Sequence, residues 1–194
     1  CGVSFAFAFA FAFAFAFSFL FSSSSSSISA RSAERIKKAL SSKNLKVGFA
    51  WSGKPTHLRD QVRTMDVSLF GDLFDSKNTD FFSLQKVSKK EDLKFLAKYK
   101  NIYNCEADLK DFLHTAYLVN EMDVILTIDT SLVHMSGTLG KKTYLFLPLV
   151  PDFRWGLNKN QDWYPNLELL RQVNIDDWSH PVKEAKKLIK KLSS

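Results

Sequence analysis

The chain has 194 residues, of which 45% are hydrophobic and 24% charged, with a formal net charge of +7, and these values fit one compact domain with a tail. Two cysteines, Cys1 and Cys105, exclude a disulfide framework and are typical of a cytoplasmic protein. The four histidines lack the spacing of metal ligands, and the sequence has neither a P-loop nor a strict GxGxxG. We therefore expect no metal ion and no ATP or NAD cofactor.

The N-terminal residues are of low complexity. Residues 5–17 alternate Phe and Ala strictly, and serines fill residues 22–27. Residues 3–21 are long and apolar enough for a membrane span or a signal-peptide core, yet no basic residue precedes them. We expect residues 1–44 to be a disordered tract and linker, with a membrane segment and a mis-translated repeat as alternatives. The folded domain is expected over residues 45–194, in a cytoplasmic protein that is membrane-associated only if residues 3–21 insert.

Apolar runs typical of strands alternate with amphipathic segments typical of helices from residue 46 onward. The expected strands cover 46–51, 81–85, 101–104, 124–128, 143–147 and 169–172, and the expected helices 65–74, 91–99, 111–120, 132–139 and 178–192. This alternation predicts an α/β fold, a Rossmann-like parallel sheet with helices on both faces. In such a sheet, ligands bind at the carboxyl ends of the strands.

The loop after the first strand begins with Ser52, Gly53 and Lys54. Glycine lets a ligand approach the backbone closely, and a lysine supplies a flexible positive charge to a phosphate. An exposed loop lysine without a function is the alternative for Lys54. Arg59 to Arg63 continues this segment as a polar loop, and Gln85 ends the second strand at the same edge of the predicted sheet.

The most informative stretch is the apolar, β-branched strand at 124–128 and the residues that follow it. Asp129, Thr130 and Ser131 are residue types that cap helices, and Gly140 is a typical helix stop. The stretch therefore predicts a strand, a tight turn and a helix. A helix N-terminus carries partial positive charge and unpaired N–H groups, so we expect it to bind an anion such as a phosphate.

His134 follows Thr130 by four residues, so one helical turn brings both to the same side of the helix. Its imidazole can then face the same anion. The alternative is that Asp129, Thr130 or Ser131 only caps the helix and that His134 is an ordinary, partly buried histidine.

The segment after Pro148 is a long loop that combines aromatic residues, an arginine and prolines. Arg154 can pair with a phosphate, and an arginine packed on Trp155 as a structural element is the alternative. The last predicted helix carries five lysines on its polar face, at positions 183, 186, 187, 190 and 191. Because a lysine-rich helix face is usually solvated, we expect no nucleic-acid binding, and a basic nucleic-acid-binding protein remains the less favoured alternative.

Five stretches in this order resemble one protein family: KVGFAWSGKPTH, FFSLQK, DFLHTAYLVNEMDVILTIDTSLVHMSGTLGKKTYLFLP, PDFRW and DWYP. They look like the C-terminal domain of heptosyltransferase-like (glycosyltransferase family 9-like) enzymes, in the form attached to tetratricopeptide repeats in bacterial proteins. The resemblance covers residues 45–192. It implies one half of a GT-B glycosyltransferase, which binds a nucleoside-diphosphate sugar and transfers the sugar to an acceptor that the sequence does not identify.

The resemblance also implies roles for single residues. By this resemblance, Asp129, Thr130 and His134 would contact the diphosphate and sugar. Ser52 and Lys54 would approach the phosphates, and Gln85 would contact the nucleoside or sugar. Ser131 stands where relatives often have Ser or Gly, and Lys142 where they usually have proline. Because the acceptor site and any catalytic base of a GT-B enzyme normally come from the other half, the catalytic residues are unknown. A non-catalytic nucleotide-sugar-binding fragment is therefore the alternative function.

Overall fold

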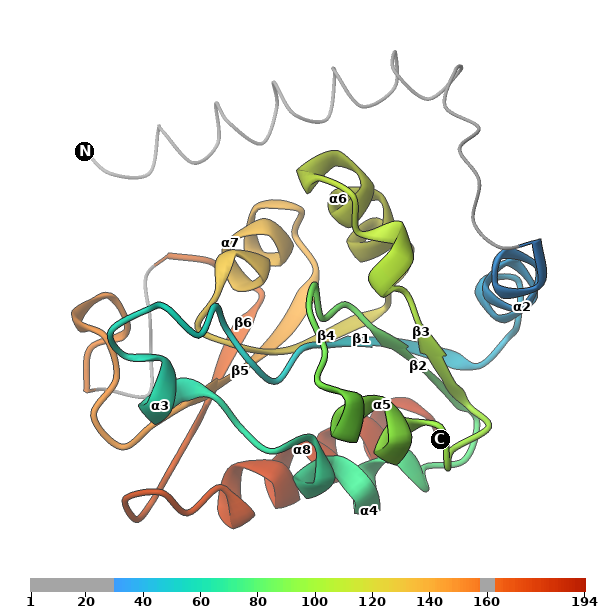
Figure 1. The fold of residues 1–194 in the computed structure, drawn as a ribbon. Coiled ribbons are helices and arrows are strands. Elements are labelled where there is room, and N and C mark those ends of the chain that lie inside the picture. Colours follow the sequence, from blue (N-terminus) through green and yellow to red (C-terminus); the bar gives the residue numbers. More distant parts are fainter. Residues whose placement is uncertain (1–29, 158–162) are drawn as a thin grey trace.

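The computed structural model describes residues 30–157 and 163–194, which form one α/β domain (Figure 1). Its six strands form a single sheet in the order β3-β2-β1-β4-β5-β6, and every neighbouring pair is parallel. The strands are β1 (Leu45–Phe49), β2 (Thr79–Ser83), β3 (Ile102–Asn104), β4 (Val124–Ile128), β5 (Lys142–Leu147) and β6 (Leu167–Arg171). The predicted Rossmann-like parallel sheet is confirmed.

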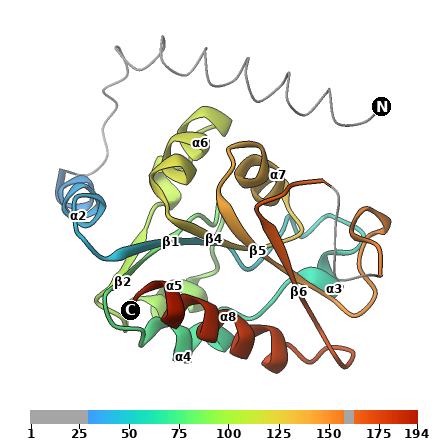
Figure 2. The same cartoon turned by 180° about the vertical axis from the view of Figure 1, so that it is seen from behind.

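Helices cover both faces of this sheet, as predicted. One face is covered by α2, α6 and α7, and the other by α4, α5 and α8 (Figures 1 and 2). The α-helices are α2 (Ala30–Leu40), α3 (Asp60–Arg63), α4 (Gly71–Phe74), α5 (Lys90–Leu96), α6 (Phe112–Glu121), α7 (Ser131–Thr138) and α8 (Ser179–Leu192). Three short 3-10 helices are η1 (Val67–Phe70), η2 (Glu106–Asp108) and η3 (Phe153–Trp155).

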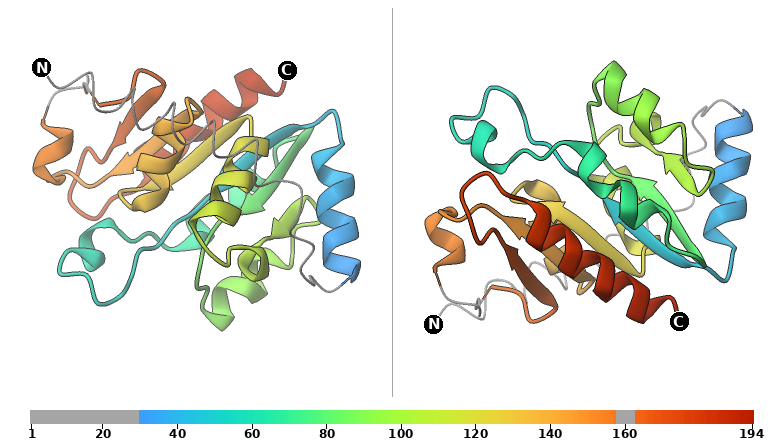
Figure 3. Two further views of the ribbon diagram at one scale, coloured as in Figure 1. Left: turned by 90° about the horizontal axis from the view of Figure 1, so that it is seen from above. Right: turned by 90° about the horizontal axis from the view of Figure 1, so that it is seen from below.

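The central strands are covered on both faces, and β4 is accordingly apolar at four of its five positions. All five residues of β2 and all five of β4 are buried. On the α8 face the core is aromatic: the Phe49 ring lies 5.1 Å from that of Phe74 and 6.3 Å from those of Phe70 and Phe81, centroid to centroid. Figure 3 shows α8 crossing this face of the sheet. The helix buries Pro181, Val182, Ala185 and Ile189, and its lysines are exposed.

The strand order creates a switch point between β1 and β4. The connection that leaves β1 leads to η1 and α4 on one face of the sheet, whereas the connection that leaves β4 leads to α7 on the other face (Figure 1). A crevice forms outside the carboxyl ends of two adjacent strands whose connections diverge in this way, and it is where open α/β sheets bind ligands. The loop at 50–59 and the turn at 129–131 therefore meet at this crevice.

The prediction of one continuous helix over residues 65–74 is wrong, because the segment is divided into η1 and α4, and one residue expected to be buried is exposed. Asp66 accepts a hydrogen bond from the N–H of Ser68 and so starts the 3-10 helix η1, which only then gives way to α4. The tighter winding of η1 turns Leu69, expected inside, to 40% exposure, while Val67 is 2% exposed. The polar loop predicted at residues 59–63 contains the short helix α3.

The packed part of the described chain begins in α2, ahead of the boundary predicted at residue 45. Ile36 and Ala39 are 7% and 3% exposed and belong to the core on the α6 face. Ser42 Oγ and Asn44 Nδ2 donate hydrogen bonds of 2.7 and 3.1 Å to Asp80 Oδ2 at the start of β2. Two apolar side chains and a shared carboxylate thus attach this segment to the sheet.

None of the helices in the described residues is long and apolar enough to cross a bilayer. Residues 3–21, the candidate membrane segment, lie outside the described residues. A membrane role for that segment, and the cytoplasmic location, stay predictions.

Candidate functional site

The loop after β1 is held in place by the side chain of Gln85. Its Oε1 accepts hydrogen bonds from the N–H groups of Trp51 and Ser52 (3.3 and 3.2 Å). Its Nε2 donates hydrogen bonds to the carbonyl oxygens of Ser52 and Val87 (3.1 and 3.2 Å). A glutamine amide has two donors and two acceptor sites, so these bonds use all of them. Gln85 therefore supports the loop in this arrangement, and its contact with a nucleoside or sugar stays a prediction.

Gly53 lies against the ion pair of Arg63 and Asp60. Arg63 Nε is 3.3 Å from Asp60 Oδ1, and a Cβ on Gly53 would lie 2.3 Å from Arg63 Nη2 and 2.5 Å from Asp60 Oδ1. The absence of a side chain at Gly53 thus allows the Arg63 guanidinium to lie against the backbone of the loop. The N–H of Gly53 donates to Thr64 Oγ1 (3.3 Å), which closes the loop on α3.

The turn after β4 has the predicted capping structure. Thr130 is the N-cap of α7, and its Oγ1 accepts the N–H of Leu132 (3.3 Å), while its hydroxyl hydrogen can still be donated to a ligand. Ser131 is the first helical residue and is exposed. At the other end, Gly140 has φ +69°, the left-handed conformation that ends helices, so the predicted stop is confirmed. The positive end of α7 therefore lies at the sheet's carboxyl edge.

Asp129 and Arg154 lie side by side in the same region. Asp129 is 8% exposed, and its Oδ2 is 3.6 Å from Arg154 Nη2. Arg154 Nε is in turn 3.5 Å from Asp152 Oδ1, and its Cζ lies 5.7 Å from the centroid of the Phe153 ring. The aromatic ring next to the Arg154 guanidinium is thus that of Phe153, whereas the structural alternative places the arginine on a tryptophan. Its side chain is 36% exposed, so the guanidinium remains accessible to an anion.

Arg59 joins the loop after β1 to the loop after β5. Its Nη2 donates to the carbonyl of Val150 (2.6 Å) and its Nη1 to that of Pro151 (3.3 Å). Arg59 also lines a pocket open to solvent, with an empty volume of about 330 Å³ that includes the solvent at its mouth. It is lined by His57, Arg59, Val62, Arg63, Asp129, Leu147, Pro148, Asp152 and Arg154. The lining includes three arginines and two aspartates, and Arg63 also pairs with Asp60 outside the lining. Arginine guanidinium groups suit an anionic ligand.

His134 adjoins this pocket without lining it. Its Nδ1 lies 3.1 Å from the hydroxyl of Tyr164, and its ring stacks on that of Trp155 at 5.7 Å and 20°. Burial lowers the pKa of His134; the charge of Asp129 acts against this shift, and that of Arg154 adds to it. The imidazole is therefore neutral at neutral pH, and it lies near two charged residues of the pocket.

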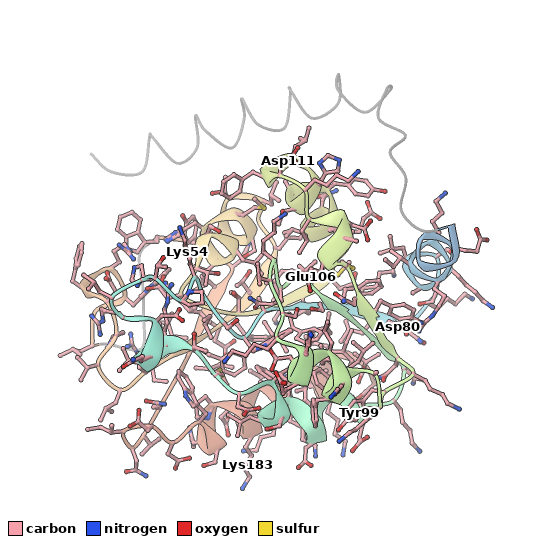
Figure 4. The ribbon with its side chains drawn as sticks, viewed as in Figure 1. Lys54, Asp80, Tyr99, Glu106, Asp111 and Lys183 are labelled. Carbon is pink, nitrogen blue, oxygen red and sulfur yellow. The ribbon has the colours of Figure 1, made fainter. Side chains whose placement is uncertain are left out.

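Lys54 is exposed on the loop that leads from β1 to α3 (Figure 4). Its ammonium group makes no ion pair with the residues that the structure describes. The alternative of a plain loop lysine thus stays open beside the predicted phosphate contact.

The structure brings most of the predicted site residues to one edge of the sheet: the turn residues Asp129, Thr130 and Ser131, with His134, Arg154 and the loop that holds Ser52, Gly53 and Lys54. The sequence pattern missed the roles of Arg59, Arg63 and Tyr164. Two arginines four residues apart in a loop at this edge are a usable signal, since one turn of helix aligns them. The contact between Tyr164 and His134 joins distant segments and has no local signal.

No family model matches the chain, and no curated protein is similar to it in sequence. Among solved structures, the chain is similar to the glycosyl transferase family 9 protein from Veillonella parvula DSM 2008, with a TM-score of 0.45 and 13% identity over 85% of this chain and 51% of that one. It is also similar to a variant of the wall teichoic acid polymerase TagF, with a TM-score of 0.39 and 11% identity over 84% of this chain and 40% of that one. The chain thus spans about half of the first protein and less of the second, and the likeness is one of fold.

Proposed function

We propose that this domain binds the diphosphate of a nucleoside-diphosphate sugar at the carboxyl ends of β1 and β4, as the donor half of a GT-B glycosyltransferase. One observation carries the proposal: a pocket lined by three arginines lies beside the N-terminus of α7, at the switch point of the sheet. Helix N-termini and arginines are the two groups that proteins use most for phosphate. The heptosyltransferase-like motifs of the sequence support a nucleotide sugar over other phosphorylated ligands.

The same groups suit the chemistry of sugar transfer. The bond between the sugar's anomeric carbon and the diphosphate oxygen breaks, a bond to the acceptor oxygen forms, and the acceptor's proton passes to a base. Negative charge then grows on the leaving diphosphate, where the α7 N-terminus, Arg154 and Lys54 would stabilise it. These groups need no metal ion for that step, and the acceptor is a glycan, lipid or protein that a second domain would hold.

Ligand-dependent melting of the full chain tests the donor site. We would screen UDP, ADP, GDP, CDP and their common sugar conjugates, since a ligand that binds only the folded state must stabilise it by about 2.7 kcal/mol at a hundred times its dissociation constant. Arg154→Gln should abolish the shift. Lys183→Gln removes the same charge from the exposed face of α8 (Figure 4) and should leave the shift unchanged. A screen in which no nucleotide raises the melting temperature would overturn the proposal.

A second candidate is a nucleotide-sugar-binding module without transferase activity. It is favoured by the two carboxylates of the pocket, because Asp129 and Asp152 both pair with Arg154, and their side chains are only 11% and 24% exposed. Release or transfer of a radiolabelled sugar from the best nucleotide separates the two candidates. Binding with neither hydrolysis nor transfer supports the module, and turnover supports the enzyme.

A further inference from the structure

Three segments of the chain enclose the imidazole of His134. The ring belongs to α7, one of its faces stacks on Trp155 of η3, and its Nδ1 meets the hydroxyl of Tyr164, which precedes β6. Trp155 is only 1% exposed, so the stack is part of the core. The ring is therefore held by its face and by one of its two nitrogens.

Gly137 makes room for this arrangement. A Cβ at this position would lie 2.4 Å from Tyr164 Cγ and 2.6 Å from its Cδ1, distances that real Cβ atoms do not show. The bare backbone of α7 at Gly137 thus allows the phenol ring to lie flat enough against the helix to reach His134, one turn earlier. The position of Tyr164 is set by packing as well as by its hydrogen bond.

A neutral imidazole carries one proton, on Nδ1 or on Nε2, and the partner of one nitrogen decides which. Between a phenol and an imidazole, the pairing of phenol O–H with ring nitrogen joins the more acidic donor to the more basic acceptor. The reverse pairing would use the phenol oxygen, whose lone pair is partly delocalised into its ring. The Tyr164 hydroxyl is therefore expected to donate to Nδ1, which places the proton of His134 on Nε2.

We infer that Tyr164 is a positioning residue that fixes His134 as the Nε2–H tautomer, so that the ring offers a hydrogen-bond donor to an anionic ligand at the pocket. Among the described residues, none hydrogen-bonds to Nε2, which leaves that nitrogen for the ligand. The identity of the anion as the donor diphosphate rests on the proposed function. The tautomer itself does not, because it is a property of the ligand-free protein.

Long-range ¹H–¹⁵N NMR correlation on the ligand-free full chain, at a pH of about 7.5 where the ring is neutral, tests the tautomer directly. We expect His134 to show a protonated Nε2 and an unprotonated Nδ1. In Tyr164→Phe, which keeps the ring that packs on Gly137, we expect the two tautomers to mix. Protonated Nδ1 in the native protein, or an unchanged spectrum in Tyr164→Phe, would overturn the inference.

Affinity measurements supply the functional readout. Titration with pyrophosphate and with the best nucleoside diphosphate should show binding about tenfold weaker in Tyr164→Phe, because a hydrogen bond to a charged group is weakened. The double variant with His134→Ala should bind no worse than His134→Ala alone, since Tyr164 acts through the imidazole. Tyr99→Phe, which removes a phenol hydroxyl on the opposite face of the sheet, is the matched control and should bind like the native chain.

These readouts separate the two claims. A Nε2–H spectrum without binding of any nucleotide or pyrophosphate supports the role of Tyr164 and overturns the proposed function. Binding that is equal in the native chain and in Tyr164→Phe, with a mixed tautomer in both, supports the proposed function and overturns the role of Tyr164.

Discussion

Arg63 Nη1 donates a 2.6 Å hydrogen bond to the main-chain carbonyl of Asp129 and thereby ties α3 to the turn after β4. The same guanidinium reaches Asp60 with its Nε and lies against the backbone of Gly53. One planar side chain therefore joins the connections that leave β1 and β4 on opposite sides of the switch point. The two walls of the crevice are held at a fixed separation.

Replacing Arg63 should loosen both walls. Arg63→Gln leaves the buried carbonyl of Asp129 and the carboxylate of Asp60 without their partner, and we expect a loss of about 1–3 kcal/mol in unfolding free energy. Nucleotide affinity should fall as well. Arg63→Lys, which keeps the charge but cannot make both contacts, should recover only part of either loss. Urea denaturation measures the change in stability, and calorimetric titration measures the change in affinity. Unchanged stability in Arg63→Gln would show that the contacts of Arg63 do not contribute to the unfolding free energy.

Thr130 should affect stability and binding together. Thr130→Ala removes the cap of α7 at a cost of about 1 kcal/mol in stability. If the diphosphate accepts a hydrogen bond from the threonine hydroxyl, the free energy of binding should separately weaken by about 1–3 kcal/mol. Thr130→Ser keeps both the cap and the hydroxyl and should resemble the native chain. Nucleotide affinity equal in Thr130→Ala and the native chain would make Thr130 a capping residue only.

Gln85 should act through the loop that it supports. Gln85→Ala removes four hydrogen bonds and leaves the N–H groups of Trp51 and Ser52 without acceptors, so we expect a loss of about 3 kcal/mol in stability. Gln85→Glu keeps the size and the acceptors but places an oxygen against the carbonyls of Ser52 and Val87, and should also destabilise the fold. Equal melting temperatures for Gln85→Glu and the native chain would favour a ligand contact over loop support.

Gly137→Ala should destabilise the chain, although alanine favours helices by about 1 kcal/mol over glycine. The added Cβ would displace the rigid ring of Tyr164 and with it the partner of His134. The control is Gly71→Ala in α4, where the nearest atom is the Tyr99 hydroxyl at 3.1 Å and a small shift suffices. A melting temperature that falls in Gly137→Ala but not in Gly71→Ala would support this expectation. Equal melting temperatures for the two variants would contradict it.

The pH dependence of stability should carry a contribution from His134. Its folded-state pKa is lowered from the ordinary 6.5, chiefly by burial, so near and below pH 6.5 the unfolded chain binds a proton that the folded chain does not. The contribution is fully present above that pH and is lost as the pH falls through 6.5 towards the lower folded value. His134→Asn removes this term. Between pH values of about 7.5 and 5.5, the native chain should therefore lose more stability than the variant, as read from denaturation midpoints.

The sequence is most informative where local signals agree. The bounds of β4, Val124–Ile128, match the prediction. An apolar, largely β-branched run between a charged residue and a capping residue strongly favours a buried strand. Thr130 and Gly140 likewise mark the ends of α7 by their own backbone preferences. These signals place the predicted site residues of the β4–α7 turn at the carboxyl edge of the sheet.

Two of the missed features depend on contacts between distant segments, and a third on the local winding of a 3-10 helix. Arg63 and Asp129 are 66 residues apart, and nothing in the local pattern distinguishes this arginine from a solvated one. Gln85 is a polar residue at a strand end, a position that fits a ligand contact equally well, and only the fold shows its amide filled by main-chain groups. Leu69 follows an apolar pattern that a 3-10 turn moves to the surface.

The central place of β1 in the sheet has a consequence for how the chain acquires its structure. β1 can pair with β2 after about thirty residues of intervening chain, but its other edge stays open until β4 arrives, as the contact between Lys46 and Asp123 across 77 residues shows. Until then, Val47 and Phe49 line an apolar strand with an unpaired row of backbone groups, which is a template for pairing with another chain. Refolding should therefore be slow and sensitive to protein concentration, and a chain truncated before residue 124 should aggregate rather than fold.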